Sequence, residues 1–454
     1  MMSLSQAALA IGGELRGDDA VFSAVSKDTR TLAKNDLYVA LKGENFDGHA
    51  FLNQAAELGA AGALVSDPKV LALPQICVGD TRIALGNLAA EWRRQFKGKL
   101  VAITGSNGKT TVKEMCRAIL FEAVGKDRVL STQGNLNNDI GMPMTLLSIR
   151  QQHDYAVIEM GANHVDEINY LTQIAKPDVA VITNAGPAHL EGFGSIEKVA
   201  QAKSEIYGGL TDDGVAIINL DDDYADYWQQ VCKGKNIVTF SMKDKKADVY
   251  AEAAGDGAYV FKTGSADMNI TMNIPGRHNV MNALASTAVA LVLEVSPENI
   301  VSGLQSFSSV SGRLNIQPGL NGVRLIDDSY NANPLSLNAA IDVLTEMEGE
   351  SCLVLGDMAE LGESAAALHF EAGRHAKKQG VDKLYAIGEL SRNAVKGFGE
   401  GASFYEDRNA LIEVLVENMN ASTTVLVKGS RSMAMEKVVN ALLLNDNNNK
   451  QRVS

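Results

Sequence analysis

The stretch Lys99–Val112, KLVAITGSNGKTTV, combines the residue types that hold the phosphates of a nucleotide. Its apolar run Leu100–Ile103 predicts a buried strand, and a turn of small residues separates that strand from a predicted helix. Glycines let backbone N–H groups approach phosphate oxygens, and a helix N-terminus adds a favourable dipole. A lysine neutralises charge and a hydroxyl binds Mg²⁺. We therefore expect the phosphate site to consist of Gly105, Ser106, Asn107, Gly108, Lys109, Thr110 and Thr111.

The spacing of this loop differs from that of the general P-loop, which places four residues between its two glycines. Here Ile103 stands where the first glycine should be, so the loop is the shortened variant G-x-x-G-K-T-T. An ordinary glycine turn is the alternative for a bare G-K-T. The strand before the loop and the helix after it favour phosphate binding.

Polar residues after two further apolar runs are candidates to complete the site. Glu159 ends the run Tyr155–Glu159, and a carboxylate at a strand end can hold the Mg²⁺ of a nucleotide. His189 lies in a Gly/Pro loop after the run Val179–Thr183 and is a candidate second ligand, although a structural histidine is the alternative. Lys203 lies within a helical pattern, and taken alone it predicts only a solvated lysine.

Further polar loops lie between predicted elements or follow predicted strands. Thr132–Asn138 is rich in amides, which favours ligand hydrogen bonds over a turn alone. Asp327–Pro334, the acidic loop Gly356–Gly362 and the basic loop Val427–Arg431 follow strands, where α/β proteins bind ligands. Opposed charges in neighbouring loops would suit a zwitterion that carries an amine and a carboxylate. The alternative is a set of capping and turn residues on a solvated rim.

Two polar clusters stand out near the start of the chain, Ser26–Arg30 and Lys42–His49. The second cluster comes directly after a strand-like run, Asp36–Leu41, and loops at strand ends carry ligand sites in α/β units. A solvated turn with a capping aspartate is the alternative for both.

The alternation of strand-like and helical patterns predicts an α/β fold with three domains. Residues 1–80 form a small α/β domain, with a helix over Ala50–Leu58. Residues 81–312 form a doubly wound, mainly parallel sheet of the P-loop ATPase type, with helices that include Ile196–Leu210 and Val280–Leu293. Residues 313–454 form a third α/β domain, with helices that include Pro334–Thr345.

Composition and charge limit the function classes. The net charge is −14 and no basic run is present, which argues against nucleic acid or an anionic membrane as a partner. The four cysteines lack C-x-x-C spacing and are expected to be buried free thiols. The longest apolar run, Ala283–Leu293, is too short to span a bilayer, and no signal-peptide pattern is present. A cytoplasmic monomer is expected.

Taken together, these residues resemble the Mur ligase family, the ATP-dependent amide-forming enzymes of peptidoglycan synthesis. T-G-S-N-G-K-T-T is similar to that family's P-loop. The motifs T-Q-G-N-L-N-N-D-I-G-M-P, D-D-S-Y-N-A-N-P, L-G-D-M-A-E-L-G and V-K-G-S-R-S-M-A-M-E most resemble the member that adds D-alanyl-D-alanine. The D-N-P-R motif of the member that adds the third amino acid is absent from the sequence. The family's order of residues is matched by Glu159, His189, Lys203, Asn282, Arg313, Asp328 and Lys428.

The resemblance implies a reaction and a role for each domain. D-alanyl-D-alanine would be joined to UDP-N-acetylmuramoyl-tripeptide through an acyl phosphate, with ATP converted to ADP and phosphate. The N-terminal domain would bind the UDP-sugar, the central domain ATP, and a Rossmann-like C-terminal domain the incoming dipeptide. Two Mg²⁺ ions would be held with the help of a carbamylated Lys203, and burial must lower the pKa of this lysine because only the neutral amine reacts with CO₂.

The resemblance also implies roles for single residues. The catalytic group would be Lys109, Glu159, His189 and Lys203, and the metal ligands Thr110, Glu159, His189 and carbamylated Lys203. Nucleotide contacts beyond the phosphate loop would be Asn282, Arg313 and Asp328. The uridine diphosphate would meet Ser26, Thr29, Arg30, Asp47, Gly48 and His49, and the sugar-peptide Asn135 and Asn137. Further substrate contacts would be Tyr330, Asn331 and Asn333, with Asp357, Lys428 and Arg431 at the dipeptide.

Two alternative functions remain open at this point. One is another amide ligase on the same scaffold, such as a different Mur ligase or a folylpolyglutamate synthase. The other is a P-loop switch or regulatory ATPase, although the N-K-x-D motif of GTPase switches is absent from the sequence.

Overall fold

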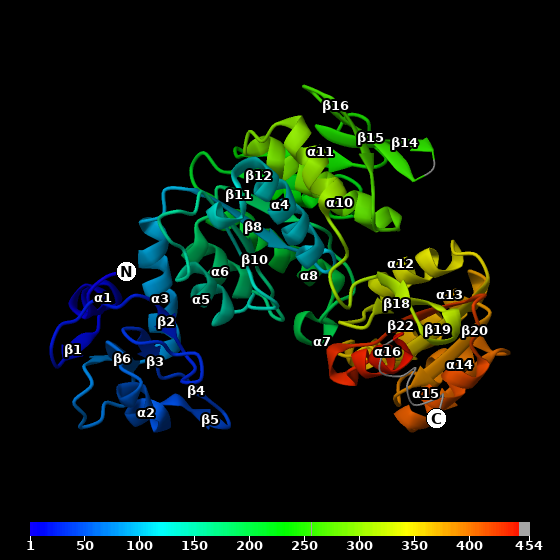
Figure 1. The fold of residues 1–454 in the computed structure, drawn as a ribbon. Helices are drawn as coiled ribbons and strands as arrows, with labels where there is room; N and C mark the ends of the chain where they lie inside the picture. Colours follow the sequence, from blue (N-terminus) through cyan, green and yellow to red (C-terminus); the bar gives the residue numbers. More distant parts are fainter. Residues whose placement is uncertain (256, 445–454) are drawn as a thin grey trace.

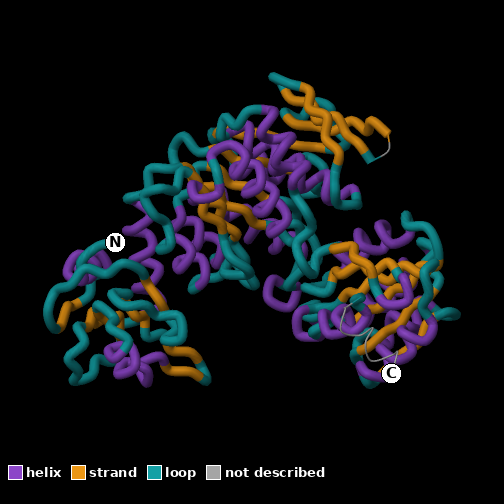
Figure 2. The backbone as a smooth tube through the Cα atoms, viewed as in Figure 1, coloured by secondary structure: helices purple, strands orange, loops and turns teal. Residues whose placement is uncertain are grey.

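Three large β-sheets with helices packed against them divide the chain into three consecutive lobes (Figure 1). The structure is a computed structural model that describes residues 1–255 and 257–444. Strands lie side by side within each lobe and helices cover them (Figure 2). The α/β class and the three-lobe organisation expected from the sequence are confirmed.

The N-terminal lobe contains a five-stranded sheet of β1 (Glu14–Arg16), β2 (Val25–Ser26), β3 (Leu37–Val39), β6 (Gly62–Val65) and β7 (Gln75–Cys77). The order is β1-β7-β6-β3-β2, in which only β1 is antiparallel to its neighbour. The hairpin of β4 (Lys42–Gly43) and β5 (Phe46–Asp47) projects from it. The helices are α1 (Leu4–Ile11) and α2 (Leu52–Glu57), the latter preceded by a 3₁₀ turn over Gly48–Phe51.

The central lobe is organised by a nine-stranded sheet of order β16-β15-β14-β13-β12-β11-β8-β10-β9. Its parallel part consists of β8 (Lys99–Thr104), β9 (Val129–Ser131), β10 (Tyr155–Glu159), β11 (Val179–Ile182), β12 (Val215–Asn219), β13 (Asn236–Ser241) and β14 (Val249–Gly255). β15 (Ala258–Thr263) and β16 (Asp267–Thr271) extend it as an antiparallel meander. The helices are α3 (Thr81–Arg94), α4 (Lys109–Val124), α5 (Gly141–Leu146), α6 (Glu167–Ala175), α7 (Leu190–Phe193), α8 (Ile196–Ser204), α9 (Ala225–Val231), α10 (Arg277–Val292) and α11 (Pro297–Ser306).

The C-terminal lobe has a six-stranded sheet of order β17-β18-β22-β19-β20-β21. β17 (Asn315–Pro318) is antiparallel to its neighbour, and the parallel strands are β18 (Arg324–Asp328), β19 (Glu350–Gly356), β20 (Lys383–Ile387), β21 (Ala402–Tyr405) and β22 (Thr423–Lys428). The helices are α12 (Pro334–Thr345), α13 (Ala365–Lys378), α14 (Arg392–Phe398), α15 (Arg408–Asn418) and α16 (Glu436–Leu442).

α3 joins the first two lobes because it shares its apolar face with both. Asp80 caps its N-terminus by accepting hydrogen bonds from the backbone N–H groups of Arg82 and Ile83. Leu85 and Leu88 of α3 belong to one buried cluster that reaches from the N-terminal lobe to one face of the central sheet. α4, α10 and α11 cover the opposite face with a second apolar cluster. The C-terminal sheet likewise has an apolar cluster on each face.

The predicted helix over Ile196–Leu210 is shorter in the structure. The pattern over Ile196–Leu210 forms α8 only as far as Ser204, and a 3₁₀ turn continues over Glu205–Gly209. Gly208 and Gly209 explain the difference, because glycine is a poor helix former. The apolar run Ala283–Leu293 lies inside and just after α10 and is mostly buried, as expected. In the described part of the chain, no helix combines the length and apolar character needed to cross a bilayer.

Candidate active site

The phosphate loop has the strand–turn–helix geometry that the sequence predicts. It connects β8 to α4, and Gly108 caps α4 with a φ of +80°. Gly105 has a φ of +149°, and a Cβ placed there would lie 1.9 Å from the hydroxyl oxygen of Thr183. Both glycines are therefore required by the backbone itself, because other residues adopt such φ values at a cost.

The loop after β11 holds the phosphate loop in place. The backbone N–H of Ser106 donates to the carbonyl oxygen of Asn184 at 2.9 Å, and that of Asn107 donates to the Asn184 side chain at 3.0 Å. The Thr183 hydroxyl donates to the Asn107 carbonyl oxygen at 2.5 Å. The conformation of the phosphate loop thus depends on a segment almost 80 residues further along the chain.

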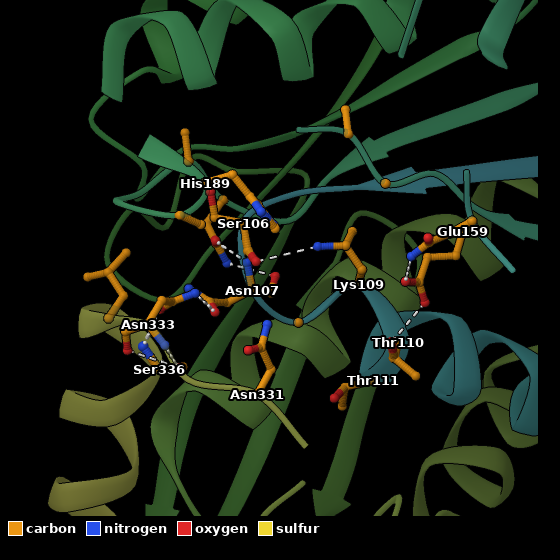
Figure 3. Close-up of a pocket in the computed structure, with 18 of the residues that line it drawn as sticks. Ser106, Asn107, Lys109, Thr110, Thr111, Glu159, His189, Asn331, Asn333 and Ser336 are labelled. Carbon is orange, nitrogen blue, oxygen red and sulfur yellow. Dashed lines mark hydrogen bonds between the residues drawn. The ribbon is translucent and has the colours of Figure 1, made fainter. Parts of the chain in front are cut away.

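Lys109 folds back over the loop that precedes it (Figure 3). Its Nζ donates to the carbonyl oxygen of Gly105 at 2.6 Å. Desolvation lowers the pKa of Lys109, and the nearby Glu159 carboxylate works in the opposite direction. A partly buried cation beside backbone amides at a helix N-terminus is a suitable site for polyphosphate.

Glu159, at the end of β10, lies beside the start of α4, as the sequence predicts (Figure 3). Its Oε2 accepts a hydrogen bond from the Thr110 hydroxyl at 2.8 Å, and its Oε1 accepts one from the Asn137 amide at 2.8 Å. The backbone N–H of Glu159 donates to the Thr132 hydroxyl at 2.9 Å. The amide-rich loop and the phosphate loop therefore meet at one carboxylate.

His189 precedes α7 with a φ of +54° and contacts the C-terminal lobe. Its Nδ1 forms a hydrogen bond with the Glu360 carboxylate, and the Glu191 N–H donates to the Glu360 carbonyl oxygen at 3.2 Å. Desolvation lowers the pKa of His189, and the positive charge of Lys109 acts in the same direction. A neutral imidazole of this kind can serve as a metal ligand.

Lys203 is buried in the last turn of α8, so the solvated lysine expected from the sequence alone is wrong. Its Nζ lies 5.5 Å from the centre of the Phe193 ring. Within the described residues, no carboxylate lies at ion-pair distance from this amine. Desolvation and the charge of Lys109 lower the pKa of Lys203 to about 7.

Several predicted nucleotide contacts gather opposite the phosphate loop. Asn282, on α10, faces Gly108 closely, since a Cβ on Gly108 would lie 2.4 Å from the Asn282 Oδ1. The Arg313 guanidinium stacks over the Tyr330 ring at 4.4 Å from its centre. Asp328 and Lys428 are register neighbours on β18 and β22 and form a buried ion pair. Burial raises the pKa of the Asp328 carboxyl, against the influence of Lys428.

A cavity of about 1480 Å³ joins these groups between the central and C-terminal lobes. The two lobes also touch beside it, where the Asn333 amide donates to the Asn107 side chain at 2.8 Å (Figure 3). The predicted site residues that line the cavity are Ser106, Asn107, Gly108, Lys109, Thr110, Thr111, Asn135, Asn137, Glu159, His189, Asn282, Arg313, Asp328, Tyr330, Asn331, Asn333, Lys428 and Arg431.

Gly105, Lys203 and Asp357 do not line the cavity. Gly105, at the start of the phosphate loop, packs against the Thr183 hydroxyl, and Lys203 is buried in α8. One Asp357 oxygen accepts hydrogen bonds from the Ser391 N–H and hydroxyl, both at 2.8 Å. Asp357 therefore has a structural partner already, and its contact with a dipeptide stays a prediction.

The predicted uridine diphosphate cluster lies in the N-terminal lobe, apart from the cavity lining. Arg30 forms a two-pronged ion pair with Asp28 and is largely exposed. His49 is buried, its Nδ1 contacts Asp47 at 2.6 Å, and its Nε2 accepts from the Ser66 N–H at 3.0 Å. Both ring nitrogens of His49 are engaged within the lobe. The remaining predicted contacts also have partners in this lobe. The Thr29 hydroxyl donates to the Gln54 side chain, and the Ser26 hydroxyl donates to the Asp28 carbonyl oxygen. Gly48 packs against Leu41.

The residues fit a nucleotide-bound cation better than a site built by the protein alone. Among the described residues, no group of three or more His, Cys, Asp or Glu is arranged to hold a metal ion. A hydroxyl and a carboxylate oxygen do meet at Thr110 and Glu159, and oxygen ligands are those that Mg²⁺ prefers. Phosphate oxygens would have to supply much of the remaining coordination.

Sequence reasoning missed Glu360, which lines the cavity, and the buried Lys113, which lies outside the cavity lining. Glu360, in the G-D-M-A-E-L-G loop, carries the contact to His189, whereas the sequence favoured Asp357 in the same loop. Lys113 is buried one helical turn beyond Lys109. The spacing of four residues between Lys109 and Lys113 places both on one face of α4 and was the available signal.

Comparisons with known proteins agree with this geometry. Three family models match the chain: "Mur ligase family, catalytic domain" at residues 21–93, "Mur ligase middle domain" at 103–290 and "Mur ligase, glutamate ligase domain" at 312–431. The UDP-N-acetylmuramoyl-tripeptide--D-alanyl-D-alanine ligase of Escherichia coli K12 is 44% identical, over 97% of this chain and 98% of that protein. The enzyme of the same name from Bacillus subtilis is 36% identical, over 94% of each chain.

Solved structures show the same similarity. A crystal structure of MurF from Acinetobacter baumannii superposes with a TM-score of 0.90 at 36% identity, covering 97% of this chain and 98% of that one. MurF ligase from Thermotoga maritima in complex with ADP superposes with a TM-score of 0.82 at 28% identity, covering 92% and 96%.

Proposed function

The chain belongs to the Mur ligase family, and on that premise we propose that it joins D-alanyl-D-alanine to UDP-N-acetylmuramoyl-tripeptide at the expense of ATP. The names of its full-length relatives support this reaction. The observation that carries the proposal is the interlobe cavity, where the phosphate loop, the Glu159 carboxylate and the Lys428 side chain face one space. Such a space can hold a triphosphate between an acid from one side and an amine from the other.

The first step is attack by the terminal carboxylate of the tripeptide on the γ-phosphorus of ATP. An acyl phosphate forms, the bond between the γ-phosphorus and the bridging oxygen breaks, and ADP leaves with that bond's electron pair. Lys109 and the backbone amides of the phosphate loop stabilise the charge that spreads over the phosphoryl oxygens. Positioning and electrostatics supply the rate enhancement, since the protein forms no covalent bond in this step.

The second step is attack by the free amine of D-alanyl-D-alanine on the acyl carbon. The new amide bond forms as phosphate leaves, and the amine loses a proton. Closure of the C-terminal lobe over the cavity excludes water, which would otherwise hydrolyse the acyl phosphate. The contacts of Glu360 with His189 and of Asn333 with Asn107 support a closed arrangement of this kind.

Two Mg²⁺ ions complete the proposed site. Bound to the nucleotide, they would neutralise phosphate charge and orient the γ-phosphoryl group. Thr110 and Glu159 would hold one ion, and His189 with carbamylated Lys203 the other. The pKa of about 7 for Lys203 supports carbamylation, because a substantial share of its amine is then neutral at physiological pH and can add CO₂.

The remaining assignments are proposals of the same kind. Residues 1–80, with Ser26, Thr29, Arg30, Asp47, Gly48 and His49, would bind the uridine diphosphate. Residues 81–312 would bind ATP, with Asn135 and Asn137 on the sugar-peptide and Asn282 on the nucleotide. Residues 313–454 would contribute Arg313 and Asp328 to the nucleotide and Tyr330, Asn331, Asn333, Asp357, Lys428 and Arg431 to the substrates. We propose a cytoplasmic monomer that acts on small molecules.

Release of phosphate tests the proposal directly. Purified protein is mixed with ATP, Mg²⁺, UDP-N-acetylmuramoyl-tripeptide and one amine at a time, and the ligated product is identified by mass spectrometry. D-alanyl-D-alanine should give product and stoichiometric phosphate. Single amino acids, including glutamate, should not. ATP turnover that persists without any acceptor would favour a regulatory ATPase instead.

A further inference from the structure

A buried lysine near the phosphate loop has no part in the steps above. Lys113 lies one helical turn after Lys109 in α4, and its side chain is only 1% exposed. Its Nζ donates to the carbonyl oxygen of Thr132 at 2.6 Å and pairs with the Glu114 Oε1 at 2.8 Å. Burying a charged amine is unfavourable unless it is paired and hydrogen-bonded. The protein supplies both here, through the Glu114 carboxylate and the Thr132 carbonyl oxygen, so the surroundings of Lys113 are suited to a charged amine.

The partner of Lys113 is the first residue of the amide-rich loop 132–138. Thr132 also accepts a hydrogen bond on its hydroxyl from the backbone N–H of Glu159 at 2.9 Å. Further along the loop, the Asn137 amide donates to the Glu159 carboxylate at 2.8 Å, and the Asn137 carbonyl oxygen accepts from the Gly161 N–H at 2.9 Å. The loop is thus held at its start by Lys113 and near its end by Glu159.

The connection joins two parts of the site that have different ligands. α4 begins at the phosphate loop, and Asn135 and Asn137 line the cavity. The Lys113 amine fixes the distance between this helix and the Thr132 backbone, which a neutral apolar side chain cannot do. Glu159 in turn receives hydrogen bonds from both sides, from Thr110 of α4 and from Asn137 of the loop.

We propose that Lys113 is a positioning residue that sets the loop 132–138, and through it Glu159, relative to the phosphate loop. The inference rests on the proposed function, in which this loop contacts the sugar-peptide. Lys113 does not line the cavity, so its proposed role needs no contact with nucleotide or substrate. It acts on the affinity for the sugar-peptide and on the placement of the Glu159 carboxylate.

The test compares Lys113→Met, Lys113→Arg and the control Lys126→Met, which changes an exposed lysine just after α4. Lys113→Met should raise KM for the UDP-sugar-peptide and lower kcat, for a combined loss in kcat/KM of about 10- to 100-fold. Binding of ADP measured calorimetrically without metal should stay at the wild-type value, since the phosphate loop is unchanged. Lys113→Arg should recover most of the loss because it keeps a charged donor. A uniform loss of ADP and sugar-peptide binding would overturn the inference.

Two further measurements do not depend on turnover. Hydrogen exchange of the amides in residues 132–140 should accelerate in Lys113→Met and not in Lys126→Met. Thr132→Val removes the hydroxyl that accepts the hydrogen bond from the Glu159 N–H. The double variant Lys113→Met/Thr132→Val should lose less kcat/KM than the product of the two single-variant losses, because both residues act on one loop. Multiplicative losses with unchanged exchange would refute the role. A wild-type protein that makes no product with D-alanyl-D-alanine would refute the proposed function instead, and the exchange experiment would still decide the role of Lys113.

Discussion

Nδ1 of His189 in the central lobe and a carboxylate oxygen of Glu360 in the C-terminal lobe share a hydrogen bond, although the residues lie 171 positions apart in the sequence. Both have positive φ values, +54° and +61°, which non-glycine residues adopt at a cost. The contact lies at the edge of the cavity, and both residues line it. It is one of the points at which the C-terminal lobe docks onto the loop after β11.

Replacement of Glu360 should weaken this docking. Glu360→Ala removes the carboxylate, and since the pair is partly exposed we expect a loss of about 1 kcal/mol, or about fivefold in kcat/KM for D-alanyl-D-alanine. Small-angle X-ray scattering should show a larger radius of gyration for the variant. Glu363→Ala, an exposed neighbour in the same segment, is the control. Equal scattering and kinetics for the two variants would show that the contact has no role in docking.

Lys109→Met should abolish most of the activity without harming the fold. Within the described chain, its Nζ donates only to the carbonyl oxygens of Gly105 and Ser106, so no side-chain network depends on it. Loss of a preorganised charge at the phosphates should lower kcat by about 10²- to 10³-fold. Phosphate release and a thermal unfolding curve are the measurements. A variant with normal kcat would remove Lys109 from the mechanism, and an unfolded variant would show a structural role.

Lys203→Ala tests the carbamate. Ligation should nearly disappear, because the alanine cannot supply the oxygen ligands that the carbamate would provide. Added short carboxylates such as acetate should restore part of the rate by entering the space left by the side chain. Steady-state assays with and without acetate measure the effect. Full activity of the variant in the absence of acetate would eliminate the carbamate from the mechanism.

The pH dependence of stability should reveal the burial of the same lysine. The pKa of Lys203 falls from 10.5 to about 7 on folding, so the unfolded chain binds the proton more tightly. The destabilisation by Lys203 is therefore full below pH 7 and disappears as the pH rises towards 10.5. In CO₂-free buffer, Lys203→Met should unfold at a higher denaturant concentration than wild type at pH 6.5, and this difference should shrink at pH 9. A difference that does not change with pH would contradict the lowered pKa.

Gly108→Ala should disturb the phosphate loop where it packs against α10. The added Cβ would lie 2.4 Å from the Asn282 Oδ1, on a backbone with a φ of +80°. We expect a stability loss of about 1–2 kcal/mol from the backbone alone, together with weaker ATP binding. Urea unfolding and ADP calorimetry measure the two effects. Gly125→Ala, at the other end of α4 with a φ of +89° and open space around it, is a matched control that should lose stability and keep ADP binding.

Local patterns in the sequence determined much of this protein. The phosphate loop, the strand that ends at Glu159 and the helix α12 that begins after the Asn333 cap were predictable, because each depends on residues a few positions apart. The α/β class followed from the same alternation of strands and helices. The strand β13 was not predicted, although its β-branched and aromatic residues Ile237–Phe240 are a signal that could have indicated it.

Tertiary structure alone decided the relations between distant segments. The sequence placed Lys203 on a helix but did not show that packing buries its amine, which is what lowers its pKa. It placed Asp328 and Lys428 in separate loops, yet the pairing of β18 with β22 makes them partners. Glu360 contacts His189 only because two lobes pack together, and Lys113 contacts Thr132 only because the loop 132–138 packs against α4. Burial and charge pairing depend on what surrounds a side chain in space, and a single sequence states only what surrounds it along the chain.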